Sequence, residues 1–186
     1  VKWADVVDSA SYKSARQAVE LKEPGLRLAL FLEGCSDASY RKEIIKRLIS
    51  EPISKIVKSP FIARELKKLD NEAGKAREFF KNVSVLKGNI MLVDTTKTKF
   101  FISRYMEYFL HPQIGYSVRV ERAGGDYHLS VGKNPWRKNR NALNVGKLLS
   151  KYGGGGHEGV GGVDRKSKSE ILKITGEIIE YLNKYG

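Results

Sequence analysis

A run of glycines that ends in a histidine contains the residue types best suited to chemistry. Residues 153–156 are all glycine and are followed by His157. Glycine loses more backbone entropy on folding than any other residue, so such a run is kept where the backbone turns sharply or approaches a ligand closely. Successive N–H groups can hold an anion such as phosphate, and a histidine adds a donor that can carry charge. The run predicts either a phosphate-binding loop or a flexible hinge.

The residues before the glycine run indicate that it is anchored. Residues 144–152 have the spacing of a short amphipathic helix, and Gly153 then stands where glycine commonly ends a helix. A loop that follows directly from a helix is held by the fold, which favours the binding loop over the hinge.

The balance of charge indicates an anionic partner. Lysine and arginine number 34 against 21 aspartates and glutamates, which gives a formal net charge of +13. Such an excess favours polyanions, although scattered lysines often only solubilise a surface. No acidic residue lies between Asp126 and Glu158, where the basic residues are Lys133, Arg137, Lys138, Arg140, Lys147 and Lys151. Because this stretch leads into the glycine run, we expect it to bind a phosphate-rich anion such as short nucleic acid, polyphosphate or a nucleotide.

The composition excludes several other classes of protein. Hydrophobic residues make up 41% of the chain, as expected of a folded protein. No apolar run approaches the ~20 residues needed to span a bilayer. Cys35 is the single cysteine, so there is no disulfide framework and no thiolate zinc site. We therefore expect a soluble cytoplasmic protein that does not enter a membrane.

The chain begins with helical patterns and later changes to patterns of strands. We expect helices over residues 11–21, 24–35 and 39–50, and a fourth from Ser59-Pro60 onwards. Strands are expected over 89–94, 115–122, 127–132 and 159–163, with helices over 99–110 and 169–183. The fold class is α/β (α+β), with a helical N-terminal segment followed by a small mixed-sheet domain with flanking helices. The expected domains are residues 1–83 and 84–186.

Few side chains have the spacing of a metal site. His111, His128 and His157 are too far apart in the sequence for a common zinc motif. Asp5 follows Trp3 in a short apolar segment that suggests a buried strand, from whose end a carboxylate can bind Mg²⁺ or Mn²⁺. Asp8 either shares this role or caps a helix that begins near Ser9.

Other polar and aromatic residues have two interpretations each. Asp94, which precedes two threonines, is expected to be a turn or cap residue. Trp136, Tyr127 and Tyr152 either stack on nucleic-acid bases or pack in the core.

The order of motifs in the second half of the chain resembles the DHH-associated C-terminal domain. The motifs are the strand Tyr127-His128-Leu129-Ser130-Val131-Gly132, a basic segment, Asn144-Val145, the GGGGH element, and Gly161-Gly162. This domain accompanies the catalytic domain of DHH phosphoesterases, which include exopolyphosphatases, oligoribonucleases, single-strand exonucleases and cyclic-dinucleotide phosphodiesterases. Residues 3–7 also resemble the last motif of that catalytic domain, whose aspartate is a manganese ligand.

The resemblance implies roles for particular residues. It implies that substrate is bound by Gly153, Gly154, Gly155, Gly156 and His157, and that Asp5 is a metal ligand, with Asp8 as the alternative. Many relatives carry a phosphate-binding arginine at the position of Gly132, so Lys133 or Arg119 is the expected substitute here. The Asp-His-His triplet and the earlier aspartate motifs of the family are absent.

The expected function is that of the substrate-binding C-terminal portion of a manganese-dependent DHH phosphoesterase acting on phosphodiester or phosphoanhydride bonds. Its partner is an N-terminal DHH domain, and a homodimer is one arrangement the sequence allows. Without the other metal motifs, the chain as given is predicted to be inactive, and it is not expected to retain Mn²⁺ by itself. The alternative is a stand-alone single-stranded nucleic-acid-binding module without catalysis.

Overall fold

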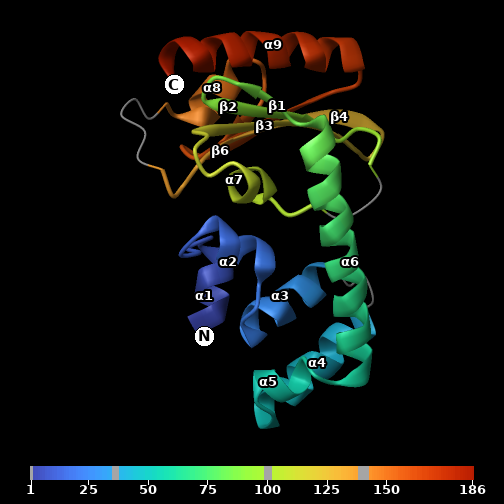
Figure 1. The fold of residues 1–186 in the computed structure, drawn as a ribbon. Coiled ribbons are helices and arrows are strands. Elements are labelled where there is room, and N and C mark those ends of the chain that lie inside the picture. Colours follow the sequence, from blue (N-terminus) through green and yellow to red (C-terminus); the bar gives the residue numbers. More distant parts are fainter. Residues whose placement is uncertain (1, 35–37, 99–101, 138–142) are drawn as a thin grey trace. The chain divides into compact units, whose positions relative to one another are not determined.

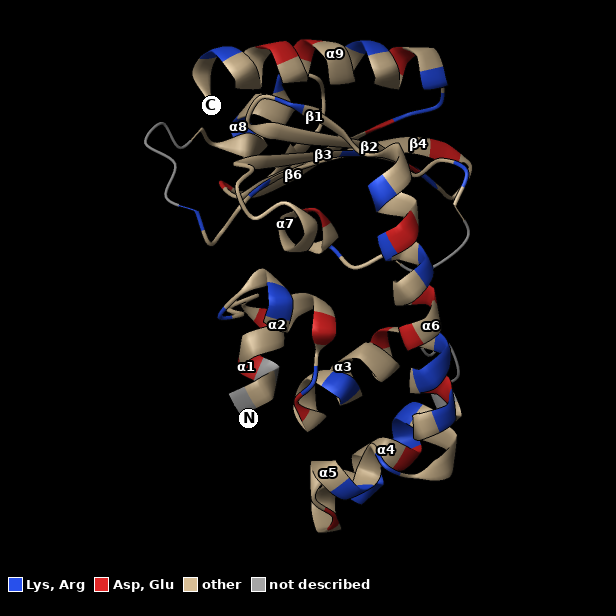
Figure 2. Ribbon diagram, in the orientation of Figure 1, with Lys and Arg blue, Asp and Glu red and all other residues tan. Residues whose placement is uncertain are grey.

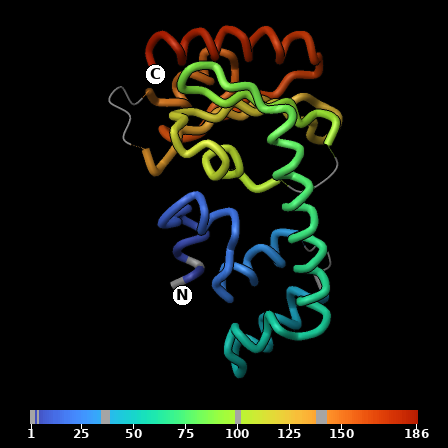
Figure 3. Tube along the Cα trace, in the orientation of Figure 1, coloured from blue at the N-terminus to red at the C-terminus, as the bar shows by residue number. Residues whose placement is uncertain are grey.

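The structure is a computed structural model that describes residues 2–34, 38–98, 102–137 and 143–186. The chain divides into two compact units, one of Val1–Ala76 with Phe100–Tyr105 (unit 1) and one of Arg77–Lys99 with Met106–Gly186 (unit 2). The division falls within α6 (Pro60–Val83), and Figure 3 traces the chain through each unit. Helices and a mixed sheet both occur, so the expected α+β class is confirmed. Among the described helices, none is both long and apolar enough to cross a bilayer.

Unit 1 is helical, as the sequence predicted. Its helices are α1 (Lys2–Asp8), α2 (Ala15–Glu20), α3 (Pro24–Gly34), α4 (Ala38–Ser50), α5 (Ile53–Ile56) and the first part of α6. The apolar faces of α3, α4, α5 and α6 share one core, whose buried members are Leu28, Leu30, Phe31, Ile44, Ile56, Ile62 and Leu66. Arg27 of α3 and Asp70 of α6 join these helices through two hydrogen bonds of 2.6 and 2.8 Å.

The first residues form a helix, so the expected buried strand before Asp5 is wrong. A Cβ atom at Gly25 of α3 would lie only 2.3 Å from the indole of Trp3, so glycine is what allows this side chain to lie against α3. Asp8 does not cap the next helix either. That helix begins at Ala15 and is capped by Ser14, whose hydroxyl accepts a hydrogen bond from the backbone of Gln17.

Unit 2 contains a six-stranded sheet among its described residues. The strands are β1 (Val85–Lys87), β2 (Ile90–Asp94), β3 (Tyr116–Ala123), β4 (Asp126–Lys133), β5 (Gly155–Gly156) and β6 (Val160–Arg165). Their order is β1-β2-β3-β4-β6-β5, and β2 and β3 are parallel whereas the other neighbours are antiparallel. The predicted β3–β4 hairpin is confirmed, and its turn uses positive φ angles of 59° and 100° at Gly124 and Gly125.

Helices cover the sheet of unit 2 on both faces (Figure 1). The helices α8 (Val145–Ser150) and α9 (Lys168–Tyr185) pack on one face, against buried strand residues such as Val118, Leu129 and Val163. Alternate residues of each strand point to the opposite face, where α7 (Met106–Leu110) covers β3. The part of this second face on β4 and β6 carries mostly small and polar residues, together with the exposed Val160.

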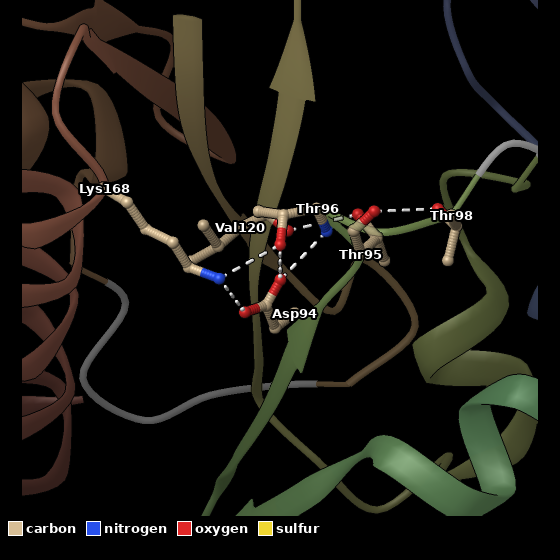
Figure 4. A network of polar contacts seen from close by, with 6 residues as sticks. All are labelled: Asp94, Thr95, Thr96, Thr98, Val120 and Lys168. Atoms are coloured by element: carbon tan, nitrogen blue, oxygen red, sulfur yellow. Dashed lines mark hydrogen bonds and ion pairs between the residues drawn. The ribbon is translucent and has the colours of Figure 1, made fainter.

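The end of β2 is fastened to the start of α9 by a polar network (Figure 4). The Asp94 carboxylate accepts hydrogen bonds of 2.9 and 2.6 Å from the backbone and hydroxyl of Thr96, so Asp94 is the turn residue that the sequence predicted. Lys168 donates to the same carboxylate at 3.1 Å. Partial burial of Asp94 opposes ionisation, but these donors outweigh it and hold the pKa of this carboxyl below its ordinary value.

Candidate anion-binding turn

The first two glycines of the run end helix α8. Gly153 has the left-handed φ of +73°, as expected of a glycine that follows a helix. Its N–H donates to the carbonyl of Ser150 and that of Gly154 to the carbonyl of Leu149, both at 3.1 Å. These two amides are used within the helix end, so they are not available to a ligand.

Close backbone packing accounts for most of the other glycines. A Cβ atom at Gly146 would lie 2.5 Å from the carbonyl oxygen of Gly156, and one at Gly154 would lie 2.2 Å from that of Gly162. Gly156 combines a φ of +145° with a would-be Cβ contact of 2.3 Å to the Val160 oxygen. Gly155 differs, since a Cβ atom there would meet nothing within 4 Å. Only this member of the run faces open space.

The turn after the glycines, residues 157–159, is fixed from three sides. His157 donates its backbone N–H to Val160 at 2.7 Å. Its carbonyl accepts from Gly146, and the next two carbonyls accept from Val145 and Lys133, at distances of 2.8, 3.0 and 2.8 Å in that order. The N-terminus of α8 and the end of β4 therefore hold the turn through its carbonyl groups.

The amides of the same turn face outward. The N–H groups of Glu158 and Gly159 donate to no other residue in the described parts of the chain, and the side chain of His157 is exposed. Two adjacent amides and an imidazole on a rigid turn form a donor set suited to an anion. The arrangement differs in part from the expected one: the amides of Gly153 and Gly154 are used within the helix end, and two candidate donors lie after the glycine run.

Lys133, one of the expected substrate-binding residues, lies beside this turn. Its ammonium group is 3.0 Å from the Glu158 carboxylate, and its side chain is 14% exposed whereas that of Glu158 is 70% exposed. An anion that approaches the turn meets a lysine whose present partner is a solvated carboxylate.

Arg119 is not available to a substrate in this structure. Two of its nitrogens donate to the two carboxylate oxygens of Glu107 at 2.8 and 2.7 Å, and both residues are buried. Burial raises the pKa of Glu107, and the charge of Arg119 opposes that rise. The expectation that Arg119 replaces the arginine of relatives is therefore not supported, because its guanidinium already pairs with a buried carboxylate.

The glycine at the position of that arginine has its own structural reason. A Cβ atom at Gly132 would lie 2.8 Å from the hydroxyl of Tyr108 and 3.1 Å from that of Ser117. These hydroxyls are hydrogen-bonded to each other at 2.8 Å, and burial raises the pKa of Tyr108 well above its ordinary value. Any larger side chain at position 132 would have to displace this pair.

The basic stretch does not form one uniform cluster. Arg137 donates to Asn89 and to the carbonyl of Gln113, and Lys151 lies over the ring of Tyr181, 5.1 Å from its centroid. Lys147 is exposed, while Lys138 and Arg140 lie outside the described residues. Along α9 basic and acidic residues are mixed (Figure 2).

The aromatic side chains considered for base stacking pack within unit 2. Trp136 makes an edge contact with Tyr108, with ring centroids 6.3 Å apart. Tyr127 and Tyr152 pack against the main core. Packing in the core is therefore the better of the two interpretations.

The structure places the expected metal ligands in helix α1. Asp5 and Asp8 both lie on α1, and both are exposed. Among the described residues, no group of three or more histidine, cysteine, aspartate or glutamate side chains is close enough to hold a metal ion. These residues do not build a metal centre, so Asp5 fits the role of one ligand at most.

One polar pair was not found in the sequence. His128 of β4 and Asp164 of β6 are cross-strand partners, with Nδ1 and Oδ1 2.7 Å apart. The two residues are 36 positions apart in the chain, so only the register of β4 and β6 brings them together. The alternation of each strand was readable, but their pairing was not.

Comparisons with known proteins support the fold. Neither a scan against protein-family models nor a search of curated proteins finds a match. Among solved structures, the chain is similar to a pGpG-specific phosphodiesterase, PggH, from Vibrio cholerae, with a TM-score of 0.83 and 20% identity. It is also similar to an exopolyphosphatase-related protein from Bacteroides fragilis, at 19% identity and a TM-score of 0.43 over 74% of this chain and 43% of that one.

The likeness to the phosphodiesterase spans 100% of this chain but 66% of that protein. The chain thus has the fold of about two thirds of a larger protein. The likeness shows that the chain shares the fold of that part of the phosphodiesterase.

Proposed function

We propose that this chain is the substrate-binding portion of a DHH-type phosphoesterase that hydrolyses phosphodiester or phosphoanhydride bonds. The observation that carries the proposal is the turn at residues 157–159, where two outward amides and the exposed His157 lie together on a rigid backbone. The names of the solved structures that resemble the chain, a phosphodiesterase and an exopolyphosphatase-related protein, agree with a phosphate ester or anhydride as substrate.

In this proposal the turn binds one phosphate group of the substrate. The amides of Glu158 and Gly159 and the imidazole of His157 donate to its oxygens, and Lys133 adds a positive charge beside them. Fixed donors of this kind need no reorganisation when the anion binds. The remaining positive charge of the chain attracts the rest of a polyanion from solution.

Catalysis would depend on a DHH domain with bound Mn²⁺, in the same polypeptide or in a partner. Asp5 would add one ligand to that centre. We expect this chain alone to bind substrate without hydrolysing it. Mn²⁺-dependent turnover by the purified chain that is absent from an Asp5→Ala variant would contradict this expectation.

The test is a binding titration at fixed salt with a short oligonucleotide and a polyphosphate. We expect His157→Ala to weaken binding of both ligands by ~1–3 kcal/mol, as for loss of a hydrogen bond to a charged group. His111→Ala is the matched control, since His111 lies on the loop after α7 and outside the turn.

The effect of His157→Ala on binding separates this proposal from the alternative function. A stand-alone nucleic-acid-binding surface would lose affinity steeply with salt and would not respond to one histidine. If His157→Ala binds both ligands like the wild type, the turn is not a phosphate site and the alternative is favoured.

A further inference from the structure

The open face of the sheet beside the turn carries a strip that lacks bulky side chains. Gly155, Gly162 and Ser130 are directly paired across β5, β6 and β4, so their side-chain positions share one face. Gly155 has open space above it, and Gly162 has no side chain. His128 and Asp164 form the next pair on this face, two residues along the same strands.

The imidazole of His128 lies over this strip. A Cβ atom at Gly162 would be 2.5 Å from Cε1 and 2.8 Å from Nε2 of the ring, so glycine is what allows the ring to take this position. The His128 side chain is 27% exposed. Its Nε2 atom has no hydrogen-bond partner within the described ranges, so it is free to meet a ligand on the strip.

The partner of the ring determines which nitrogen carries the proton. Nδ1 of His128 is 2.7 Å from the carboxylate of Asp164, and a carboxylate accepts hydrogen bonds but cannot donate them. Nδ1 must therefore carry the hydrogen. In the neutral ring, Nε2 then presents a lone pair and acts as an acceptor.

We propose that Nε2 of His128 accepts a hydrogen bond from the nucleoside part of the substrate, from a ribose hydroxyl or a base amino group. The inference rests on the proposed function, in which the turn at 157–159 holds a phosphate. Gly162 is paired with Gly155 on the neighbouring strand, and His157 lies two residues after Gly155. The strand spacing and the rise per residue together put Gly162 about 8 Å from His157. A nucleoside attached to the bound phosphate reaches that far.

This arrangement selects one class of substrate. A nucleotide offers hydroxyl and amino donors beside its phosphate, whereas the internal units of polyphosphate offer only acceptor oxygens. With the ring neutral, Nε2 beside the carboxylate of Asp164 is suited to a nucleotide and unsuited to polyphosphate. The geometry points to short oligonucleotides, dinucleotides included, as the substrate of the site.

The test compares a 5′-phosphorylated diribonucleotide with a short polyphosphate, at fixed salt and about pH 8, where histidine side chains are generally neutral. We expect His128→Ala to weaken dinucleotide binding about fivefold to tenfold, the order of one hydrogen bond, and to leave polyphosphate binding within about twofold. Asp164→Asn should weaken dinucleotide binding as well. The amide of asparagine can donate a hydrogen bond to Nδ1, which allows the tautomer in which Nε2 carries the hydrogen and can no longer accept one. His111→Ala again serves as the control.

A second measurement does not depend on a variant. In the wild-type protein, the ¹⁵N signal of His128 Nε2 should shift when the dinucleotide is added and stay in place with polyphosphate. The inference would be overturned if His128→Ala weakened the binding of both ligands equally. It would also be overturned if the dinucleotide left the chemical shift of Nε2 unchanged. If His157→Ala has no effect on either ligand, the proposed function itself fails; if only His128→Ala has none, the phosphate site stands and the nucleoside contact does not.

Discussion

Two hydrogen-bonded side-chain pairs lie on the same face of the sheet of unit 2, and they differ in what covers them. Arg119 and Glu107 are buried between β3 and α7, with side-chain exposures of 10% and 1%. His128 and Asp164 lie on β4 and β6 with exposures of 27% and 67%. The first pair is joined by two hydrogen bonds inside the protein, whereas the second pair keeps one ring nitrogen free. Burial thus makes the first pair part of the framework and leaves the second able to bind a ligand.

The largest effect should come from breaking the buried pair. Glu107→Ala leaves the guanidinium of Arg119 buried without its partner, and we expect a loss of about 3–5 kcal/mol in the free energy of unfolding. Urea denaturation measures this loss. The double variant Glu107→Leu/Arg119→Met should recover most of it, because an apolar pair removes both buried charges. A single variant as stable as the wild type would break the comparison.

The two glycines of β5 show a similar contrast, since Gly156 is packed against backbone and Gly155 faces open space. Gly156→Ala should cost about 1–3 kcal/mol or more, since it adds a strained φ to a contact with the Val160 carbonyl. Gly155→Ala should change stability by no more than about 0.5 kcal/mol, as expected of a surface substitution. Thermal unfolding of the two variants side by side measures the difference. Equal losses would mean that Gly155 is packed as closely as its neighbour.

The exposed pair should contribute little to stability. We expect His128→Ala to lower the free energy of unfolding by about 0–1 kcal/mol, since the pair is partly exposed to solvent and such pairs contribute little. The measurement is the same urea titration as for Glu107→Ala. A loss as large as that of the buried pair would make His128 a structural residue and would remove the basis for comparing the two pairs.

The smallest effect on stability should come from the Asp94 and Lys168 pair at the end of β2, whose side chains are partly exposed. Because donors hold the pKa of Asp94 below its ordinary value, its contribution is present above the unfolded value of about 4 and is lost as the pH falls through the folded value. Solvent screening limits this contribution to less than about 1 kcal/mol. The stability gap between wild type and Asp94→Asn should therefore close on acidification, as followed by urea titrations across the acid range. A gap that widens in acid would show the opposite sign of linkage.

Much of the fold was predictable because local patterns agreed with the final packing. The β3–β4 hairpin has strict alternation on both sides of two glycines, and α6 shows apolar residues at helical spacing from Ile62 to Phe80. The first helix was misread because a short apolar segment fits strand and helix equally well. Strand β5 was missed because two glycines have no pattern of their own, and only pairing with β6 makes them a strand.

The site was predictable in its position but not in its details. The glycine run and His157 mark a turn that approaches other backbone closely, and the residue types alone were enough to predict it. The first N–H groups of α8 donate to carbonyl groups of the turn, and this contact determines which amides of the turn stay available to a ligand. The pairing of Arg119 with Glu107 and of His128 with Asp164 depends on contacts between elements, which residue spacing does not contain.

The way α8 holds the turn by its carbonyls has a consequence for hydrogen exchange. The amide of His157 is bonded to Val160 and should exchange slowly with solvent deuterium, whereas the two amides that follow should exchange as fast as those of an unfolded chain. A sharp step in protection therefore falls between neighbouring residues of a single turn. A phosphate that binds there would slow the exchange of the Glu158 and Gly159 amides and leave the protection of α8 and β6 unchanged.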